Sequence, residues 1–148
     1  MTDRRNLLRM SALTGLVAVA VPGTATAAPS STKPVGVWEV TLVIKEQQRP
    51  AEVSLWSLGA DGLFLHTSDN GGTGFGRWER TGRSTFTARY REYVFSTSGV
   101  VEGQLRVSEE CTFTGADRVD VASTADFHTP DGVLVGTFHA AGTGVRVL

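Results

Sequence analysis

Apolar and polar residues alternate with a period of two along residues 84–114. Two alternating arms flank the turn 96–99, which ends in Gly99, so this stretch predicts a long β-hairpin. With an even-length loop, one face of the hairpin collects Phe86, Ala88, Tyr90, Glu92, Val94, Val101, Gly103, Leu105, Val107, Glu109, Cys111 and Phe113. The other face is mostly charged or hydroxylated, although Tyr93 and Phe95 also fall on it. One apolar face and one solvated face are typical of an antiparallel sheet.

Shorter alternating runs, separated by turn signals, predict further strands at 35–44, 53–58, 63–67, 77–80, 118–128 and 133–140. The inner face of 53–67 has two alternatives, because a slip of one residue exchanges the two sets of side chains. Either Trp56, Leu58, Leu63 and Leu65 point inward, or Val53, Leu55, Phe64 and His66 do. Eight sequential strands and no helical stretch after residue 34 predict an all-β fold, an eight-stranded antiparallel up-and-down β-barrel, with a β-sandwich as the alternative.

Glycine is frequent at two places in the predicted barrel. Residues 68–76 are dense in glycine but precede a short strand, whereas a phosphate-binding loop leads into a helix, so we expect a flexible loop at the barrel mouth. Residues 142–144 read Gly-Thr-Gly and predict a bulge or bend near the end of the chain. Between these places, the inner face continues through Phe113, Val119, Val121, Ser123, Ala125, Phe127, Leu134, Gly136, Phe138 and Ala140.

The first 27 residues have the pattern of a cleaved signal peptide. Arg4 and Arg5 precede a short apolar run, which ends at Pro22 and is followed by the small-x-small site 25–27. The paired arginines resemble the twin-arginine type of bacterial signal. We therefore expect residues 28–34 to be a flexible lead-in and residues 35–148 to be a single barrel domain, in a protein that is secreted or held in the periplasm or cell envelope.

Charge and cysteine content narrow the classes of partner. Without residues 1–27 the chain keeps 11 basic and 14 acidic side chains, a formal net charge of −3. This balance argues against nucleic acid as a partner, and the apolar run of the signal is too short for stable membrane insertion. Cys111 is the only cysteine, so an intramolecular disulfide is impossible, and its inward position predicts a small buried hydrophobe. The oligomeric state is left open.

Three residues carry a resemblance to a known family. Gly36 and Trp38 form a Gly-x-Trp at the first strand, and Arg146 lies on the last. This pattern resembles the calycins, the lipocalins and their relatives. The resemblance implies a small secreted β-barrel whose late arginine packs across the tryptophan at the closed end as a cation–π contact. Chain length and strand pattern are also similar to the allene-oxide-cyclase-like barrels, which we keep as the alternative.

Polar residues on the apolar face are the candidates for chemistry. Glu109 and Ser123 are expected to be neighbours, and Tyr90 and Glu92 lie on the opposing arm. A buried Glu109 with a raised pKa could, with Tyr90, protonate or deprotonate a small apolar ligand. We favour a simpler interpretation, in which a bulge at 108–110 leaves Glu109 wet at a barrel rim. In one of the two registers above, Trp56 would line the same cavity.

Metal and cofactor chemistry find no support in the pattern. The histidines are His66, His128 and His139, and we expect solvated surface positions for them because none belongs to a ligand-spaced cluster. We therefore expect no metal and no cofactor. Three functions stay in view: binding of a small apolar ligand inside the barrel, a cofactor-free cyclase or isomerase acting on a polyketide- or lipid-like substrate, and a filled barrel that serves as an interaction module.

Overall fold

A computed structural model describes residues 32–148, and this part of the chain contains eight strands and no helix. The strands are β1 (Gly36–Ile44), β2 (Glu52–Leu58), β3 (Leu63–Ser68), β4 (Thr73–Arg80), β5 (Thr85–Phe95), β6 (Val101–Gly115), β7 (Arg118–His128) and β8 (Leu134–Arg146). Within residues 32–148, no helix is long and apolar enough to cross a membrane. The signal-peptide assignment, residues 1–27, and residues 28–31 of the lead-in lie outside the described residues.

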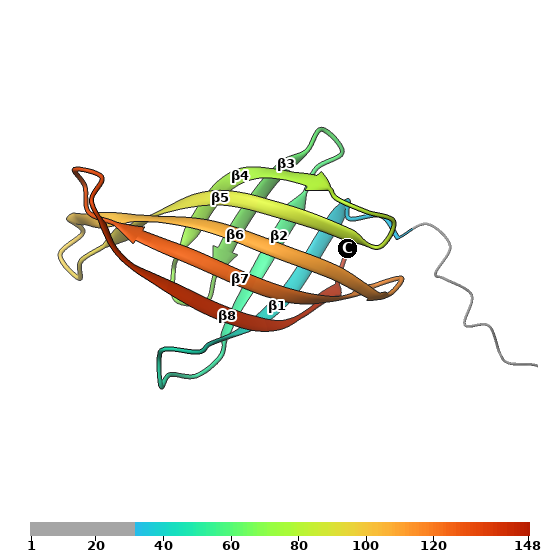
Figure 1. The fold of residues 1–148 in the computed structure, drawn as a ribbon, viewed down its shortest axis with the longest axis horizontal. Coiled ribbons are helices and arrows are strands. Elements are labelled where there is room, and N and C mark those ends of the chain that lie inside the picture. Colours follow the sequence, from blue (N-terminus) through green and yellow to red (C-terminus); the bar gives the residue numbers. More distant parts are fainter. Residues whose placement is uncertain (1–31) are drawn as a thin grey trace, which may run out of the picture.

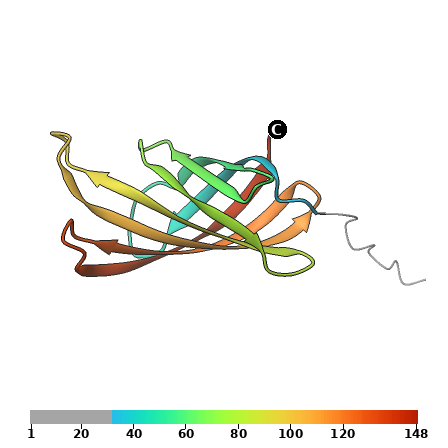
Figure 2. The same cartoon turned by 90° about the horizontal axis from the view of Figure 1, so that it is seen from above.

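Each strand pairs antiparallel with the next one, and β8 returns to pair with β1, so the sheet closes on itself (Figure 1). The predicted eight-stranded antiparallel up-and-down barrel is therefore confirmed, and the sandwich alternative is excluded. Figure 2 shows the long strands β5 to β8 forming one side of an elongated barrel. Closure leaves strand edges unpaired mainly near one end of the barrel, where β5 beyond Glu92 and β8 before Ala140 have a neighbour on one side alone.

The hairpin of β5 and β6 has the predicted inner and outer faces along most of its length. Ala88 lies opposite Glu109 and Tyr90 opposite Val107, with all four side chains buried. The prediction is wrong only near the turn, where a register shift after Val94 moves Val101 to the outer face. One extra residue on one strand is enough to exchange inside and outside.

The inner face of β2 and β3 matches neither alternative as a whole. Its buried side chains are Ser54, Trp56, Leu58, Phe64 and His66. Leu58 lies opposite Phe64 because the connection is a tight loop of three residues, 60–62, rather than the four residues 59–62. Gly62 closes this loop with a φ of 82°, in the left-handed region that a three-residue hairpin loop requires. The loop is one residue shorter than expected, and this difference changes the parity of β3 relative to β2.

Glycines that resemble loop residues in the sequence lie inside strands. β4 begins at Thr73, so the expected loop shortens to residues 69–72 and Gly74 belongs to the strand. Gly142 and Gly144 sit in β8 without a bulge or bend, contrary to expectation. A Cβ at Gly142 would lie 1.8 Å from the carbonyl oxygen of Thr41, so glycine permits close approach of β8 to β1.

The start of β8 corrects one further expectation. Leu134 was expected to face inward but is 54% exposed, because the register shifts between Phe127 and His128. Gly136 and Phe138 share the predicted inner face, opposite Phe127 and Ala125. The inner face of β8 is thus intact from residue 136 onward.

One end of the barrel is closed by packed aromatic rings and by Arg146. The Arg146 guanidinium carbon lies 4.4 Å from the centre of the Trp38 ring, and the two residues are directly opposite each other on β8 and β1. Trp38 packs edge-on against Phe113, with 5.9 Å between ring centres. Gly36 has a φ of 138° and passes so close to Arg146 that a Cβ would lie 2.7 Å from Nη1. The geometry implied by the calycin resemblance is therefore present.

The described part of the lead-in is held against this closed end. Thr32 is buried, and its carbonyl oxygen accepts two hydrogen bonds of 2.8 Å from Arg80. The carbonyl oxygen of Pro34 accepts a hydrogen bond of 2.8 Å from the Trp38 indole. Cys111 is buried in the core as predicted, at 2% exposure. Residues 32–34 thus help to close this end of the barrel.

Candidate functional site

A cavity of about 550 Å³ occupies the other half of the barrel and opens at the far end from residue 32. Its apolar walls are Leu42, Ile44, Val94, Leu105, Val107, Ala125, Phe127, Phe138 and Ala140. Its polar walls include Gln47, Arg49, Glu52, Asn70, Tyr90, Glu92, Glu109, Ser123 and His139. A volume of this size is typical of small-molecule sites, which are mostly apolar with a few placed polar groups.

Four of the five residues expected to line a cavity do so. Tyr90, Glu92, Glu109 and Ser123 all face the interior from β5, β6 and β7. Trp56 points inward as one alternative required, but it is 1% exposed and packs against Phe64 below the cavity. The alternation of residues predicts which way a side chain points, but it does not predict how deep in the barrel the packed core ends.

Glu109 is the deepest polar group of the cavity wall. It is fully buried, and the register is continuous on both sides of it, so the favoured interpretation of a wet rim position at a bulge is wrong. Burial raises the pKa of this carboxyl from 4.5 to about 7, and the neighbouring Ser123 and Tyr90 hydroxyls oppose the rise. Within the described part of the chain, Oε2 of Glu109 has no hydrogen-bond partner.

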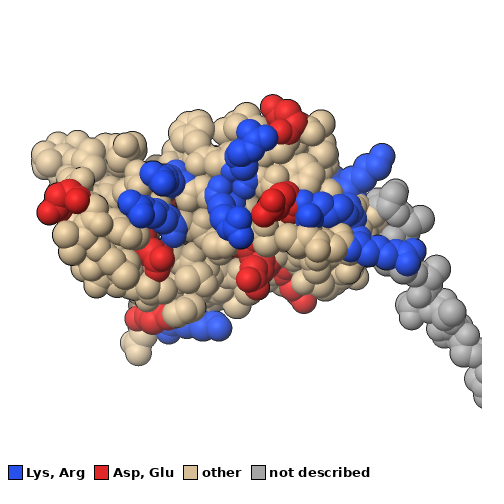
Figure 3. Space-filling model, turned by 45° about the horizontal axis from the view of Figure 1, so that its top comes forward, with Lys and Arg blue, Asp and Glu red and all other residues tan. Residues whose placement is uncertain are grey.

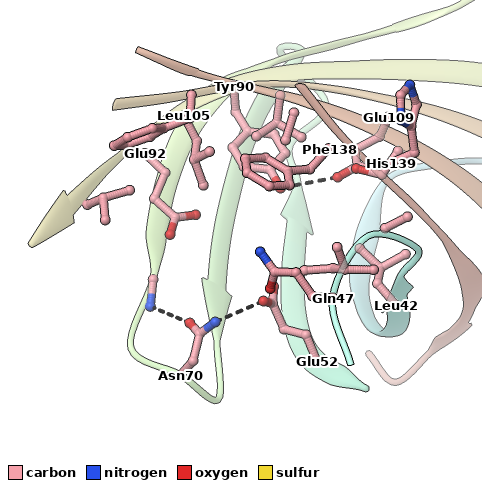
Figure 4. A pocket seen from close by; sticks show the side chains of 18 of the residues that line it. Leu42, Gln47, Glu52, Asn70, Tyr90, Glu92, Leu105, Glu109, Phe138 and His139 are labelled. Carbon is pink, nitrogen blue, oxygen red and sulfur yellow. Dashed lines mark hydrogen bonds between the residues drawn. The ribbon is translucent and has the colours of Figure 1, made fainter. Parts of the chain in front are cut away.

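Tyr90 connects Glu109 to the aromatic core. Its hydroxyl donates a hydrogen bond of 3.1 Å to Oε1 of Glu109 (Figure 4). Its ring stacks on Phe64, with 5.1 Å between ring centres, and lies 5.0 Å from the His66 ring. Burial, and then the charge of Glu109, raise the pKa of Tyr90 well above its ordinary value, so the phenol keeps its proton and donates.

The glycines of β4 make room for the Tyr90 ring. A Cβ at Gly74 would lie 2.5 Å from Cδ2 of Tyr90, and a Cβ at Gly76 would lie 1.9 Å from the carbonyl oxygen of Arg89. Neither contact is possible, so these positions admit only glycine in this arrangement. The glycine-dense segment therefore shapes the wall of the cavity in addition to forming a turn at its mouth.

His66 and Glu52 were not among the predicted site residues, although one of the two alternatives for 53–67 turned His66 inward. His66 is buried, not solvated, and its ring lies between two carboxylates, with Nδ1 3.4 Å from Glu92 and Nε2 3.9 Å from Glu52. Both positions could have been read from the two-residue alternation. Glu52 lies on the same face of β2 as the buried Trp56, and His66 lies on the same face of β3 as the buried Phe64. Which face His66 occupies relative to Glu52 depends on the length of the loop between β2 and β3, and the sequence alone did not show that this loop has three residues.

The mouth of the cavity carries a polar network on one side. Glu52 accepts hydrogen bonds from Arg49 at 3.0 Å and from Asn70 at 2.8 Å. Asn70 also accepts a hydrogen bond of 3.0 Å from the backbone N–H of Gly72, as Figure 4 shows. These bonds tie the β1–β2 loop to the β3–β4 turn. The short glycine turn at 69–72 is therefore at the mouth as predicted, and it is anchored there.

The other side of the mouth is apolar and poor in basic groups. The exposed side chains of the β5–β6 and β7–β8 hairpins include Tyr93, Phe95, Val100, Val101, Val133, Leu134 and Val135. Figure 3 shows Lys and Arg side chains over the middle and the closed end of the barrel, whereas the end at the left is mostly uncharged or acidic on this face. Of the other histidines, His139 is exposed and pairs with Glu46 at 2.7 Å, and His128 is half-buried.

Across residues 32–148, no group of three or more His, Cys, Asp or Glu side chains is arranged to hold a metal ion. No protein-family model matches the sequence, and a search of curated proteins finds no match either. The chemistry of the site therefore has to be inferred from its own geometry: a largely apolar cavity with a tyrosine–glutamic acid pair at its base and carboxylates along its wall.

Proposed function

We propose that this protein binds a small, mostly apolar ligand inside its barrel. The observation that carries the proposal is the cavity of about 550 Å³, which has apolar walls and a few converging polar groups. The open interior is also the reason to prefer this function over that of a filled barrel working through its loops. The closed end supplies rigid support, because packed rings hold the lower walls in place.

The test is native mass spectrometry of the purified protein, followed by denaturing extraction of any molecule that co-purifies. Ala125→Trp is the variant expected to abolish binding, since Ala125 lines the cavity and a tryptophan there would fill it. Ala122→Trp is its control, because Ala122 is exposed on the outer face of the same strand. Ligand binding that survives in Ala125→Trp as well as in Ala122→Trp would overturn the proposal.

A second candidate function is favoured by the bond between Tyr90 and Glu109. A carboxyl with a pKa of about 7, oriented by a phenol, is suited to general acid–base catalysis near neutral pH. The corresponding enzyme is a cofactor-free cyclase or isomerase of the allene-oxide-cyclase-like type, acting on a polyketide- or lipid-like substrate that the cavity folds into shape.

Chromatography of polyene and epoxide lipids after incubation with the protein tests this second function. Turnover that is lost in both Glu109→Gln and Tyr90→Phe, with lipid affinity retained, would favour the enzyme over the binding protein. Equal conversion by the wild type and both variants would rule out the acid–base role.

We further propose a calycin relationship and export by the twin-arginine route. The first is supported by the contact of Arg146 with Trp38 beside Gly36, and the second by Arg4 and Arg5 ahead of the short apolar run. Replacement of both arginines by lysine is expected to retain the protein in the cytoplasm. Export of that variant at the normal rate would contradict the twin-arginine proposal.

A further inference from the structure

The charged groups of the cavity wall are mostly acceptors, and one of them lacks a partner. Three glutamates reach the cavity, and Figure 4 shows their carboxylates turned toward the same space. The Arg49 guanidinium is already paired with Glu52, 3.0 Å away. Glu92 has Nδ1 of His66 3.4 Å away, so Glu109 is the carboxylate left to meet a ligand. His66, which approaches Glu92, is buried behind the wall.

Glu109 provides a built anchoring point. Its Oε1 accepts the hydrogen bond from Tyr90, whereas Oε2 makes no hydrogen bond among the described residues, although the side chain is fully buried and the Ser123 hydroxyl lies beside the carboxyl. A buried polar atom without a partner is unfavourable, and a donor group on a ligand in the cavity would satisfy it. A ligand with a hydrogen-bond donor at its inner end would therefore suit this cavity better than a pure hydrocarbon.

We propose that the ligand is a cationic amphiphile, with its ammonium group directed to Glu109 and an apolar body against the aromatic wall. This inference rests on the proposed binding function. An ammonium has three donors and no acceptor, which suits a wall whose polar atoms mainly accept. Burial, and to a smaller degree the Glu52 carboxylate, disfavours the ionised form of Glu109 and raises its pKa, and the positive charge of an ammonium opposes both effects.

The same charges select against other ligand classes. A fatty acid or a phosphate ester would bring a negative group next to Glu92 and Glu109, where like charges repel. An alcohol would satisfy Oε2 of Glu109 but would not neutralise the negative charge of this carboxylate. The rings of Tyr90, Phe127 and Phe138 in the cavity wall favour a cation through their faces and favour an apolar body through their area.

Three probes with the same ten-carbon chain separate these possibilities: decylamine, decanol and decanoic acid. We would titrate each into the full-length protein by calorimetry at about pH 7.5, where the amine and the acid are both charged. Tryptophan fluorescence is a poor alternative to calorimetry, because none of the three tryptophans of the chain lines the cavity. We expect decylamine to bind at least about ten-fold tighter than decanol, and decanoic acid to bind weakest.

The anchoring point is tested with a variant pair on one strand. Glu109→Gln is expected to weaken decylamine about ten-fold or more and to leave decanol within about three-fold. Glu110→Gln removes the same charge one residue later on the exposed outer face and should change neither affinity. If Glu109→Gln does not fold, Glu92→Gln takes its place with the same expected direction.

The outcomes are distinguishable from failure of the proposed function. Decanol or decanoic acid binding as tightly as decylamine would overturn the ammonium inference and leave a cavity that binds apolar molecules. Absence of binding by all three probes would overturn both. Equal losses in Glu109→Gln and Glu110→Gln would also overturn the inference, because a general charge effect would then explain the preference for the amine.

Discussion

The guanidinium of Arg146 lies over the indole ring of Trp38, 4.4 Å from its centre, and joins the last strand of the barrel to the first. The same side chain donates a hydrogen bond of 2.8 Å to Asp117 and further hydrogen bonds to the carbonyl oxygens of Lys33 and Val35. One arginine thus connects the lead-in, a hairpin turn and both closing strands.

Arg146→Ala should therefore destabilise the barrel. Loss of the cation–π contact and of the hydrogen bonds from a charged group is expected to lower the free energy of unfolding by about 2–4 kcal/mol. Urea denaturation measures the change. Arg106→Ala, on the exposed outer face of β6, is the control and should change stability by less than about 0.5 kcal/mol. Equal effects of the two substitutions would contradict a special role for Arg146.

Gly36→Ala should also be destabilising, for reasons of space and backbone. The φ of 138° disfavours any residue with a Cβ, and that atom would lie 2.8 Å from the carbonyl oxygen of Leu148. We expect a loss of about 1–3 kcal/mol in a thermal or urea melt. Gly136→Ala is the matched control, since nothing lies within 4 Å of its Cβ position. A melt of Gly36→Ala that matches Gly136→Ala would argue against this crowding.

Glu109 should make stability depend on pH. Its pKa of about 7 in the folded state lies above the ordinary 4.5, so the folded protein holds the proton more tightly than the unfolded chain does. Stability from this group is complete below about pH 4.5 and is lost as the pH rises through about 7, a change on the order of 3 kcal/mol. The groups that face this carboxyl or act on it are Tyr90, Ser123, Cys111 and Glu52.

The measurement is a set of urea titrations across that pH range for the wild type and Glu109→Gln. The glutamine carries no titrating proton, so the wild type should lose stability relative to the variant as the pH rises. Parallel pH profiles for the two proteins would show that Glu109 is not buried in its neutral form.

Tyr90→Phe should raise the pKa of Glu109 further. The substitution removes the hydrogen bond of 3.1 Å that favours the ionised carboxylate, while the aromatic ring remains to pack on Phe64. Carbon-13 NMR of the glutamate side chains, followed over pH, reports the change. Tyr93→Phe, at the exposed rim, should leave the titration as it is. A lower pKa in Tyr90→Phe is the result that would contradict this account.

Cys111 should resist alkylation in the folded protein. Burial raises the pKa of its thiol well above the ordinary value and also excludes the reagent. Mass spectrometry after treatment with iodoacetamide at about pH 8 is expected to find no label without denaturant and complete labelling in about 6 M guanidinium. Rapid labelling without denaturant would place this thiol outside the core.

The alternation of residues predicted the face of each long strand well, because two-residue periodicity is set by the pleat itself. The inward positions of Tyr90, Glu109 and Ser123 follow from it. Depth along the barrel axis leaves no such periodic signal. For that reason Trp56 was expected in the cavity and lies in the core, whereas Glu109 was placed at the rim and lies at the base.

Short connections were the other source of error. A single residue in the loop 60–62 set the parity of β3, and with it the burial of His66 between Glu52 and Glu92. Glycines were equally ambiguous: Gly74 and Gly142 look like loop residues in the sequence but allow close approach within strands. Which role a glycine has depends on the neighbouring strand, whose position a single sequence does not contain.

Both ends of the described chain lie at the closed end of the barrel. The backbone of Leu148 pairs with that of Val37, and Thr32 is fastened there by Arg80. In Figure 1 the C-terminus and the lead-in both leave on the side away from the β5–β6 hairpin. A surface, label or fused domain joined through either end would therefore leave the mouth unobstructed.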